Sequence, residues 1–320
     1  MGILPKGAPL QPVNWVITMS IKDVGLALLV ILIWGVNFVV IKIGLHNFSP
    51  FLLAGLRFTF VAFPACLLVS RPKVPLHLIL AYGMTISFLQ FALLFLALNL
   101  GMPAGLASLL LQSQAFFTLF FGALCLGEKI QSHHIIGLLI AVVGMVCLAN
   151  SSIHPAQKSG MTLFTLLLTL GAALSWGIGN IVNKIILRRY PVEPLKLVVW
   201  SAFVPILPFF LCAVFIDGQE RLWQSLININ LFNVITIFYL AILCTVVAYA
   251  IWGGLLSKYP TTTVAPLTLL VPVVGMVAAS IVLGETLTGS QALSVMLIIT
   301  GLIVNSFAPR IVSYLHFSKR

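Results

Sequence analysis

Uninterrupted apolar runs fill most of this chain of 320 residues, and each is about as long as a bilayer requires. A helix that spans a membrane needs about 20 predominantly apolar residues, and ten such runs follow one another with short connections. They cover residues 24–42, 51–70, 76–98, 103–126, 133–150, 161–185, 195–216, 231–256, 262–283 and 289–308. A transmembrane barrel would alternate apolar and polar residues, and these runs do not. The sequence therefore predicts an all-α polytopic membrane protein with ten transmembrane helices.

The composition excludes the soluble classes of protein. Charged residues make up 7% of the chain and hydrophobic residues 61%, whereas soluble domains carry about 25% charged residues. None of the connections is long enough for a soluble domain, and the motifs GxxxxGK[ST], HExxH and CxxC do not occur. We therefore expect neither an enzyme nor a nucleic-acid-binding protein, and we expect no cofactor and no metal ion.

The basic residues fall mainly on one side of the predicted membrane. If the ten spans cross in alternation, 13 of the 17 Lys and Arg residues lie on the side of both termini. The four on the opposite side are Lys42, Arg57, Lys158 and Arg221. Because cytoplasmic loops collect Lys and Arg, both termini are expected to be cytoplasmic. The net charge of +11 then reflects orientation in the membrane.

Two motifs recur in the same order along the chain. The Trp-Gly pair and later Lys of Trp34–Lys42 return in Trp176–Lys184, 142 residues later, and Leu126–Glu128 returns as Leu283–Glu285, 157 residues later. The chain is thus predicted to hold two five-helix units. Because five is odd, the second unit enters the membrane upside down, which is an architecture of secondary transporters. The predicted parts are an N-terminal tail, two inverted repeats and a cytoplasmic C-terminal tail: residues 1–20, 21–151, 152–310 and 311–320.

Uncharged polar and aromatic residues are the candidates for a solute site. All six acidic residues map to predicted helix ends or loops, so no carboxylate is expected at the middle of the membrane. Amide side chains both donate and accept hydrogen bonds, which suits a zwitterion, and aromatic rings can wall a cavity. The alternative for each amide is a hydrogen bond between helices, worth about 1 kcal/mol. The candidates are Trp34, Asn37, Gln90, Gln112, Gln114, Trp176, Asn180 and Tyr249.

Helical spacing separates two of these candidates. Gln112 and Gln114 are two residues apart, which is about 200° around an α-helix. We therefore expect one of them to face the cavity and the other to pack against a neighbouring helix.

Charged residues near helix ends have two interpretations each. Arg57 either extends to the membrane interface or attracts a substrate carboxylate. Glu128 and Glu285 follow a glycine at a helix end, where they are expected to form a polar turn or to cap a helix N-terminus. Lys42 and Lys184 close their helices, where cations suit the helix dipole, so interfacial anchoring is favoured over substrate binding.

Several of these stretches resemble the EamA family of the drug/metabolite transporter superfamily. The resemblance runs from about residue 20 to about residue 308 and is carried by residues 34–42, 53–58, 102–108, 126–128, 265–272 and 284–285. It implies an exporter in the bacterial inner membrane that carries small amino acids or related metabolites, such as cysteine or O-acetylserine, by alternating access. The alternative is another amino acid, a drug or another metabolite, nucleotide sugars included. The expected partners are the small solute and the lipid bilayer, and the expected state is a monomer, because the repeat already supplies two halves.

Overall fold

A computed structural model describes residues 19–153 and 161–317, and every regular element in these ranges is helical. The helices of the first half are α1 (Ile21–Gly44), α2 (Pro50–Cys66), α3 (Leu76–Tyr82), α4 (Gln90–Asn99), α5 (Ala104–Leu110), α6 (Gln114–Leu126) and α7 (Ser132–Ile153). Those of the second half are α8 (Leu163–Arg189), α9 (Pro194–Ser201), α10 (Ile206–Cys212), α11 (Gln219–Ile227), α12 (Leu231–Phe238), α13 (Ala248–Lys258), α14 (Thr261–Val264), α15 (Leu270–Leu283) and α16 (Gly289–Phe317).

Short π-helical or 3-10 segments join several of these helices into longer ones. The π segments are η1 (Gly83–Leu89), η3 (Ala213–Asp217) and η4 (Tyr239–Val247), and the 3-10 turns are η2 (Leu111–Ser113) and η5 (Ala265–Leu269). In the described residues, nine continuous helices are long and apolar enough to cross a membrane. The tenth predicted run, residues 51–70, contains α2, which is apolar and 17 residues long. That length is at the lower end of the range for a spanning helix.

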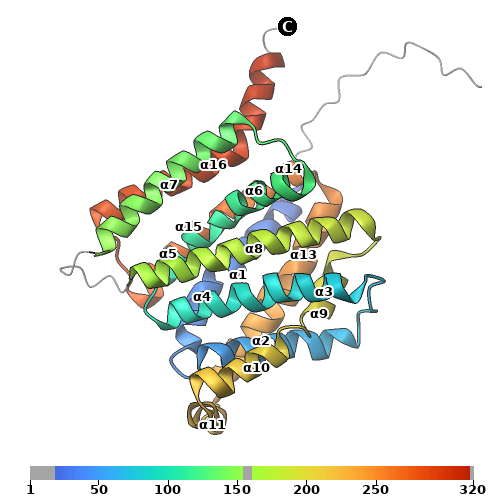
Figure 1. Ribbon diagram of the computed structural model, residues 1–320, viewed down its shortest axis with the longest axis vertical. Coiled ribbons are helices and arrows are strands. Elements are labelled where there is room, and N and C mark those ends of the chain that lie inside the picture. The colour runs from blue at the N-terminus through green and yellow to red at the C-terminus, as the bar shows by residue number, and fades with distance from the viewer. Residues whose placement is uncertain (1–18, 154–160, 318–320) are drawn as a thin grey trace, which may run out of the picture.

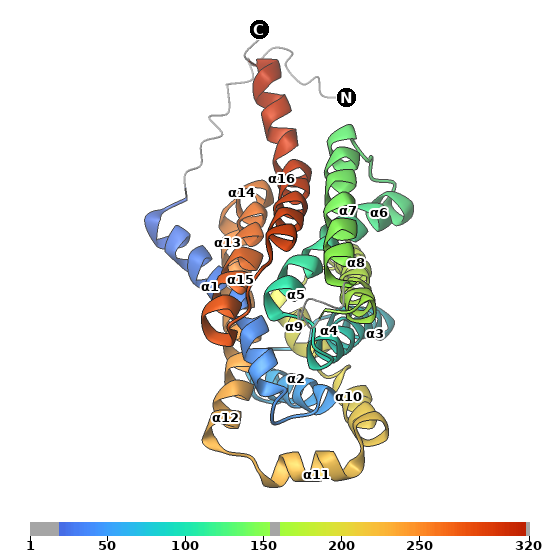
Figure 2. The same ribbon diagram turned by 90° about the vertical axis from the view of Figure 1, so that its left-hand side faces the viewer.

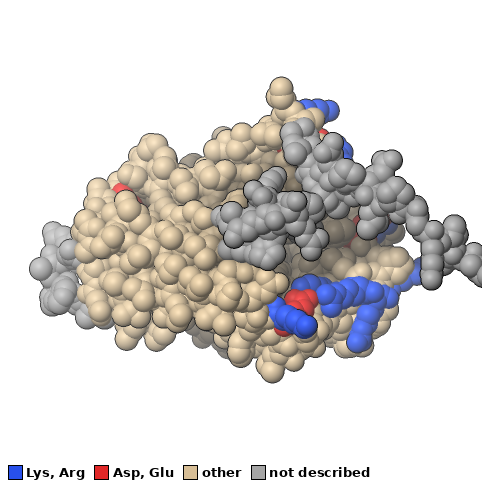
Figure 3. Space-filling view, turned by 90° about the horizontal axis from the view of Figure 1, so that it is seen from above, with Lys and Arg blue, Asp and Glu red and all other residues tan. Residues whose placement is uncertain are grey.

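The helices lie roughly side by side (Figures 1 and 2), with α7 paired with α16 at one end of the long axis and α2, α10 and α11 at the other. Many large apolar side chains on the outside are exposed, for example Leu139, Phe164 and Ile281. On the face shown in Figure 3, most of the visible charged residues gather toward one end, and the rest of the visible surface carries little charge. An exposed apolar surface of this kind is the surface that lipid covers. The structure is that of an all-helical, polytopic membrane protein.

The two halves meet through close contacts at glycines. A Cβ atom on Gly35 of α1 would lie 2.5 Å from Val274 of α15, and one on Gly177 of α8 would lie 2.6 Å from Phe117 of α6. Small residues let helices in a membrane approach this closely. The two contacts are related by the offsets of 142 and 157 residues that the sequence motifs show. The division into two repeats with the predicted bounds stays a prediction.

The predicted tails differ from the structure at one end. The segment 311–317, expected to belong to a C-terminal tail, continues helix α16 to Phe317. Most of the predicted N-terminal tail, residues 1–18, lies outside the described residues, as do residues 318–320.

Candidate functional site

A cavity of about 130 Å3 lies in the interior, where helices of both halves meet. Seven of the eight predicted site residues line it, so the structure brings together side chains that are up to about 215 residues apart in the chain. The lining residues are Trp34, Asn37, Phe38, Arg57, Gln90, Phe91, Leu94, Ser108, Leu111, Gln112, Gln114, Trp176, Cys244, Tyr249, Thr268 and Val271.

Asn180 is the predicted residue that is not part of this lining. It lies one turn beyond Trp176 on α8, and its amide group donates to Gln114 Oε1 (2.7 Å) and to Thr118 Oγ1 (3.0 Å) on α6. Asn180 therefore lies outside the cavity lining, and its hydrogen bond fixes the side chain of Gln114, which is part of that lining.

Gln112 and Gln114 both line the cavity, so the expectation that only one of them would face it is wrong. The reason is the 3-10 turn at Leu111–Ser113, between α5 and α6. With three residues per turn, side chains two apart are separated by about 120° the short way round, against about 160° in an α-helix. Gln112 Nε2 also crosses to the other half and donates to Thr268 O (3.0 Å) in the turn η5.

Trp34 forms one wall of the cavity and is itself packed between helices. Its indole N–H donates to Cys244 O (3.0 Å) in the π segment η4. Its ring contacts Tyr249 with the ring centroids 5.4 Å apart and Trp252 at 5.3 Å. Trp34 therefore both lines the cavity and packs between helices.

Arg57 is a cavity residue that the set of predicted site residues lacks. Only 4% of its surface is exposed, so it does not extend to the membrane interface. Its Nη1 donates to Asn37 Oδ1 (3.3 Å) and its Nη2 to Thr245 Oγ1 (3.2 Å), while Cζ lies 4.4 Å from the centroid of the Phe91 ring. Its Nε is buried without a hydrogen-bond partner in the described part of the chain.

A signal for Arg57 is present in the sequence. Residues 51–70 form an apolar run with one strong positive charge, two turns from the start of the helix, and a charged residue inside a membrane span is by default a functional candidate. Because Arg57 lies near the start of the predicted span, its long side chain could also have reached the membrane interface. Helix α2 is short and begins at Pro50, and it packs between α4, α10 and η4, which places the guanidinium inside.

At one end of the bundle, which we call the Glu285 end, a carboxylate caps a helix. Glu285 accepts hydrogen bonds from Ala104 N (2.7 Å) and Gly105 N (3.0 Å), the first residues of α5. The prediction of a capping role is confirmed here, although the capped helix belongs to the other half of the chain. Close by, Lys42 Nζ donates to Met102 O (2.7 Å). The start of α5 is thereby fastened to the ends of α15 and α1.

The same Gly-Glu motif has different partners at the opposite end, which we call the Glu128 end. Glu128 pairs with Lys184 (2.7 Å) and Arg188 (2.9 Å) of α8. The hydrogen bond from Lys184 is the main cause that holds the pKa of the Glu128 carboxyl below its ordinary value of 4.5. The positive charges of Lys184 and Arg188 and the hydrogen bond from Arg188 lower it further.

Helix α5 also packs closely on α15 beside the central cavity. On the Glu285 side, a Cβ on Gly275 of α15 would lie 2.6 Å from Ser108 Oγ on α5, and one on Gly105 would lie 3.1 Å from Met276 Cα. Helices α5 and α15 thus pack directly on each other between the cavity and the Glu285 end.

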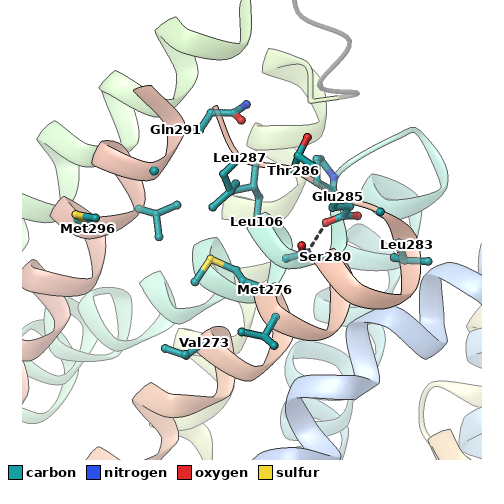
Figure 4. A pocket seen from close by; sticks show the side chains of 16 residues that line it. Leu106, Val273, Met276, Ser280, Leu283, Glu285, Thr286, Leu287, Gln291 and Met296 are labelled. Atoms are coloured by element: carbon teal, nitrogen blue, oxygen red, sulfur yellow. Dashed lines mark hydrogen bonds between the residues drawn. The ribbon is translucent and has the colours of Figure 1, made fainter. Parts of the chain in front are cut away.

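A second cavity, of about 660 Å3, lies beside Glu285 between α5, α15 and α16 (Figure 4). Its walls are mostly apolar side chains such as Leu106, Val273 and Met276, and none of the eight predicted site residues lines it. Binding sites for small solutes combine apolar walls with a few converging polar groups. The smaller central cavity has that character, and we take it as the candidate solute site.

Comparison with known proteins gives two close relatives. Proteins of Salmonella typhimurium and Escherichia coli, each described as a probable amino-acid metabolite efflux pump, are 52% identical to this chain over 294 residues. The matches cover 92% and 91% of this chain, respectively, and 97% of each relative. A probable terminal-alkyne amino-acid exporter of Streptantibioticus cattleyicolor is 26% identical over 277 residues, which is 82% of this chain and 86% of that protein.

The fold and the family agree with these relatives. A solved crystal structure matches with a TM-score of 0.59 over 90% of this chain and 98% of its own length, at 20% identity, which shows a shared fold. The pattern of the EamA-like transporter family matches the chain twice, at residues 22–150 and 163–307. Together these two segments cover nearly the whole described structure, one in each half. The chain belongs to the EamA-like transporter family.

Proposed function

We propose that the protein exports small amino acids or closely related metabolites, such as cysteine or O-acetylserine, across the bacterial inner membrane without converting them chemically. The observation that carries the proposal is the central cavity, which is small and is lined by amides and aromatic rings from both halves. The names of the relatives as amino-acid efflux pumps and exporters support the same class of solute.

Each group of lining residues has a role in this proposal. Asn37, Gln90, Gln112 and Gln114 supply hydrogen-bond donors and acceptors for a polar solute, since an amide offers both. The rings of Trp34, Trp176 and Tyr249 shape the space and exclude a larger solute. Asn180 acts from behind the wall by holding Gln114.

The size of the cavity favours a small solute over the alternatives. Pockets for drug-sized ligands measure about 300–1,000 Å3, and liquid water takes about 30 Å3 per molecule. A space of about 130 Å3 therefore suits a solute with few non-hydrogen atoms. A drug or a nucleotide sugar would require the walls to separate considerably.

The asymmetry of the two ends supports alternating access between two inverted repeats in one monomer. With both termini cytoplasmic, the Glu285 end faces the outside and the Glu128 end faces the cytoplasm. Capping of α5 by Glu285 and the packing of α5 on α15 close the outer end in this conformation. Release of the solute to the outside then requires these contacts to break, by a rocking motion of one repeat against the other.

The direct test is efflux of labelled cysteine and O-acetylserine from cells that contain or lack the protein. We expect faster efflux of at least one of the two when the protein is present. Repeating the measurement with the proton gradient collapsed separates an exporter coupled to that gradient from a facilitator. If the protein changes efflux of neither solute, the substrate assignment is wrong.

A further inference from the structure

We infer that Arg57 is the anchor for the carboxylate of the solute, which makes the transported class monocarboxylates with a small body. This inference rests on the proposed export of small amino acids and adds the group that recognises them. Arg57 lies on the wall of the central cavity and also on that of an adjoining small cavity of about 30 Å3.

The first argument is charge. The Arg57 side chain is almost fully buried, and no carboxylate of the described residues forms an ion pair with it. Burial of a charge without a counterion is costly, and in membrane spans such charges usually mark a substrate pathway. The partners that it has, Asn37 Oδ1, Thr245 Oγ1 and the Phe91 ring, carry no net charge. A solute carboxylate would supply the missing negative charge.

The second argument is geometry. A guanidinium has five N–H donors in a fixed planar fork that matches the two oxygens of a carboxylate. The hydrogen bonds to Asn37 and Thr245 use one donor on each Nη atom, and the donor on Nε has no partner among the described residues. Because Nε and the neighbouring Nη form one edge of the fork, this side chain retains donors for a bidentate contact.

The third argument is that other residues of the cavity lining suit an ammonium group. The Gln112 amide nitrogen is engaged by Thr268 O, which leaves the Gln112 amide oxygen as an acceptor. Trp34 and Tyr249 add ring faces, which attract cations. A zwitterion with its carboxylate at Arg57 and its ammonium at Gln112 would therefore meet complementary charge at both ends.

A purely structural role for Arg57 makes a different prediction. Through Asn37 and Thr245, Arg57 connects α2 with α1 and η4. If it were only a connector of helices, its loss would reduce transport of every solute by the same factor. If it is the carboxylate anchor, its loss reduces transport of solutes with a carboxylate and leaves neutralised analogues nearly unaffected.

The experiment compares transport of cysteine and of cysteine methyl ester by the full chain in proteoliposomes. We expect the wild type to favour the acid over the ester by on the order of 10- to 100-fold, as a charge-assisted hydrogen-bond pair implies. R57Q should lower transport of the acid to the rate of the ester. R57K keeps the charge but loses the fork, so its preference should be intermediate.

R189Q provides the matched control, because Arg189 is exposed and lies outside the cavity, and its preference should equal that of the wild type. A wild type that carries acid and ester equally, or an R57Q that loses both by the same factor, overturns the anchor alone. Transport of neither compound by the wild type overturns the proposed function and the anchor with it. If R57Q does not fold, R57K provides the test, because it keeps the buried charge. Its ratio of acid transport to ester transport is then compared with that of the wild type.

Discussion

Gln112 reaches from the first half to the backbone of the second, where its Nε2 donates to Thr268 O. Replacing Gln112 by Leu keeps the size of the side chain but removes both the contact between the halves and the acceptor for the solute. We expect Gln112→Leu to reduce efflux on the order of tenfold or more, since hydrogen bonds to charged groups are worth about 1.5–3 kcal/mol. The measurement is efflux of labelled solute at matched protein levels in the membrane.

Gln114→Leu tests the second amide in the same assay. This amide also accepts from Asn180, so its loss leaves the Asn180 side chain without that acceptor. The matched control is Gln224→Leu, which makes the same substitution on the exposed surface of α11 and should leave efflux unchanged. Normal export by both cavity variants would contradict the assignment of the site.

At the scale of single helices, α1 contains a matched pair of glycines. A Cβ on Gly35 would lie 2.5 Å from Val274 Cγ1, whereas one on Gly25 would meet nothing within 4 Å. Gly35→Ala should therefore destabilise the protein by about 1–3 kcal/mol through overpacking. Gly25→Ala should be neutral or stabilise α1 slightly, because alanine favours a helix by about 1 kcal/mol over glycine.

Thermal unfolding in detergent measures both glycine variants. A lower midpoint for Gly35→Ala than for Gly25→Ala is the expected order. Equal midpoints would mean that α1 and α15 separate without cost, and the close contact described above would then contribute nothing to stability.

The cap on α5 makes a prediction about access to the cavity. Glu285→Ala removes the acceptor of two backbone N–H groups, and loss of a cap costs about 0.5–2 kcal/mol. Because that cap closes the Glu285 end, the variant should spend more time open on that side. The readout is labelling of Ser108→Cys by a membrane-impermeant maleimide added from outside, after the five native cysteines are replaced.

Glu128→Ala serves as the comparison for this prediction. Glu128 has the same local motif but pairs with Lys184 and Arg188. Its loss should leave labelling of Ser108→Cys from outside unchanged. Equal labelling of all three proteins would show that the Glu285 cap does not control access.

At the scale of the whole molecule, the distribution of Lys and Arg predicts the orientation. Reporter fusions test it, since alkaline phosphatase is active only outside the cytoplasm and green fluorescent protein matures inside. A fusion at the C-terminus should fluoresce, and phosphatase inserted at Gly218, between the spans Pro194–Asp217 and Leu231–Lys258, should be active. The reverse pattern of reporter activity would place the Glu285 end in the cytoplasm and the Glu128 end outside, which contradicts the proposed orientation.

The path of the chain through the membrane follows from the sequence for a physical reason. Backbone polar groups in lipid must be satisfied within the chain, so each long apolar run has to be a helix. The seven cavity residues that were predicted share a second property, which is polarity or aromaticity deep inside an apolar run. Such a residue is costly on the lipid face, so its depth alone indicates that it faces the interior.

What the sequence by itself determined is therefore the class of fold, the family and seven of the sixteen residues that line the cavity, because these depend on apolar length, local motifs and depth. Only the tertiary structure decided how Gln112, Gln114, Asn180 and Arg57 are placed, and which Gly-Glu turn caps a helix. Their positions depend on a tightened turn, on the short helix α2 and on contacts between halves about 150 residues apart. The two Gly-Glu motifs are alike in sequence, and packing alone gives one of them a helix start as its partner and the other a pair of cations.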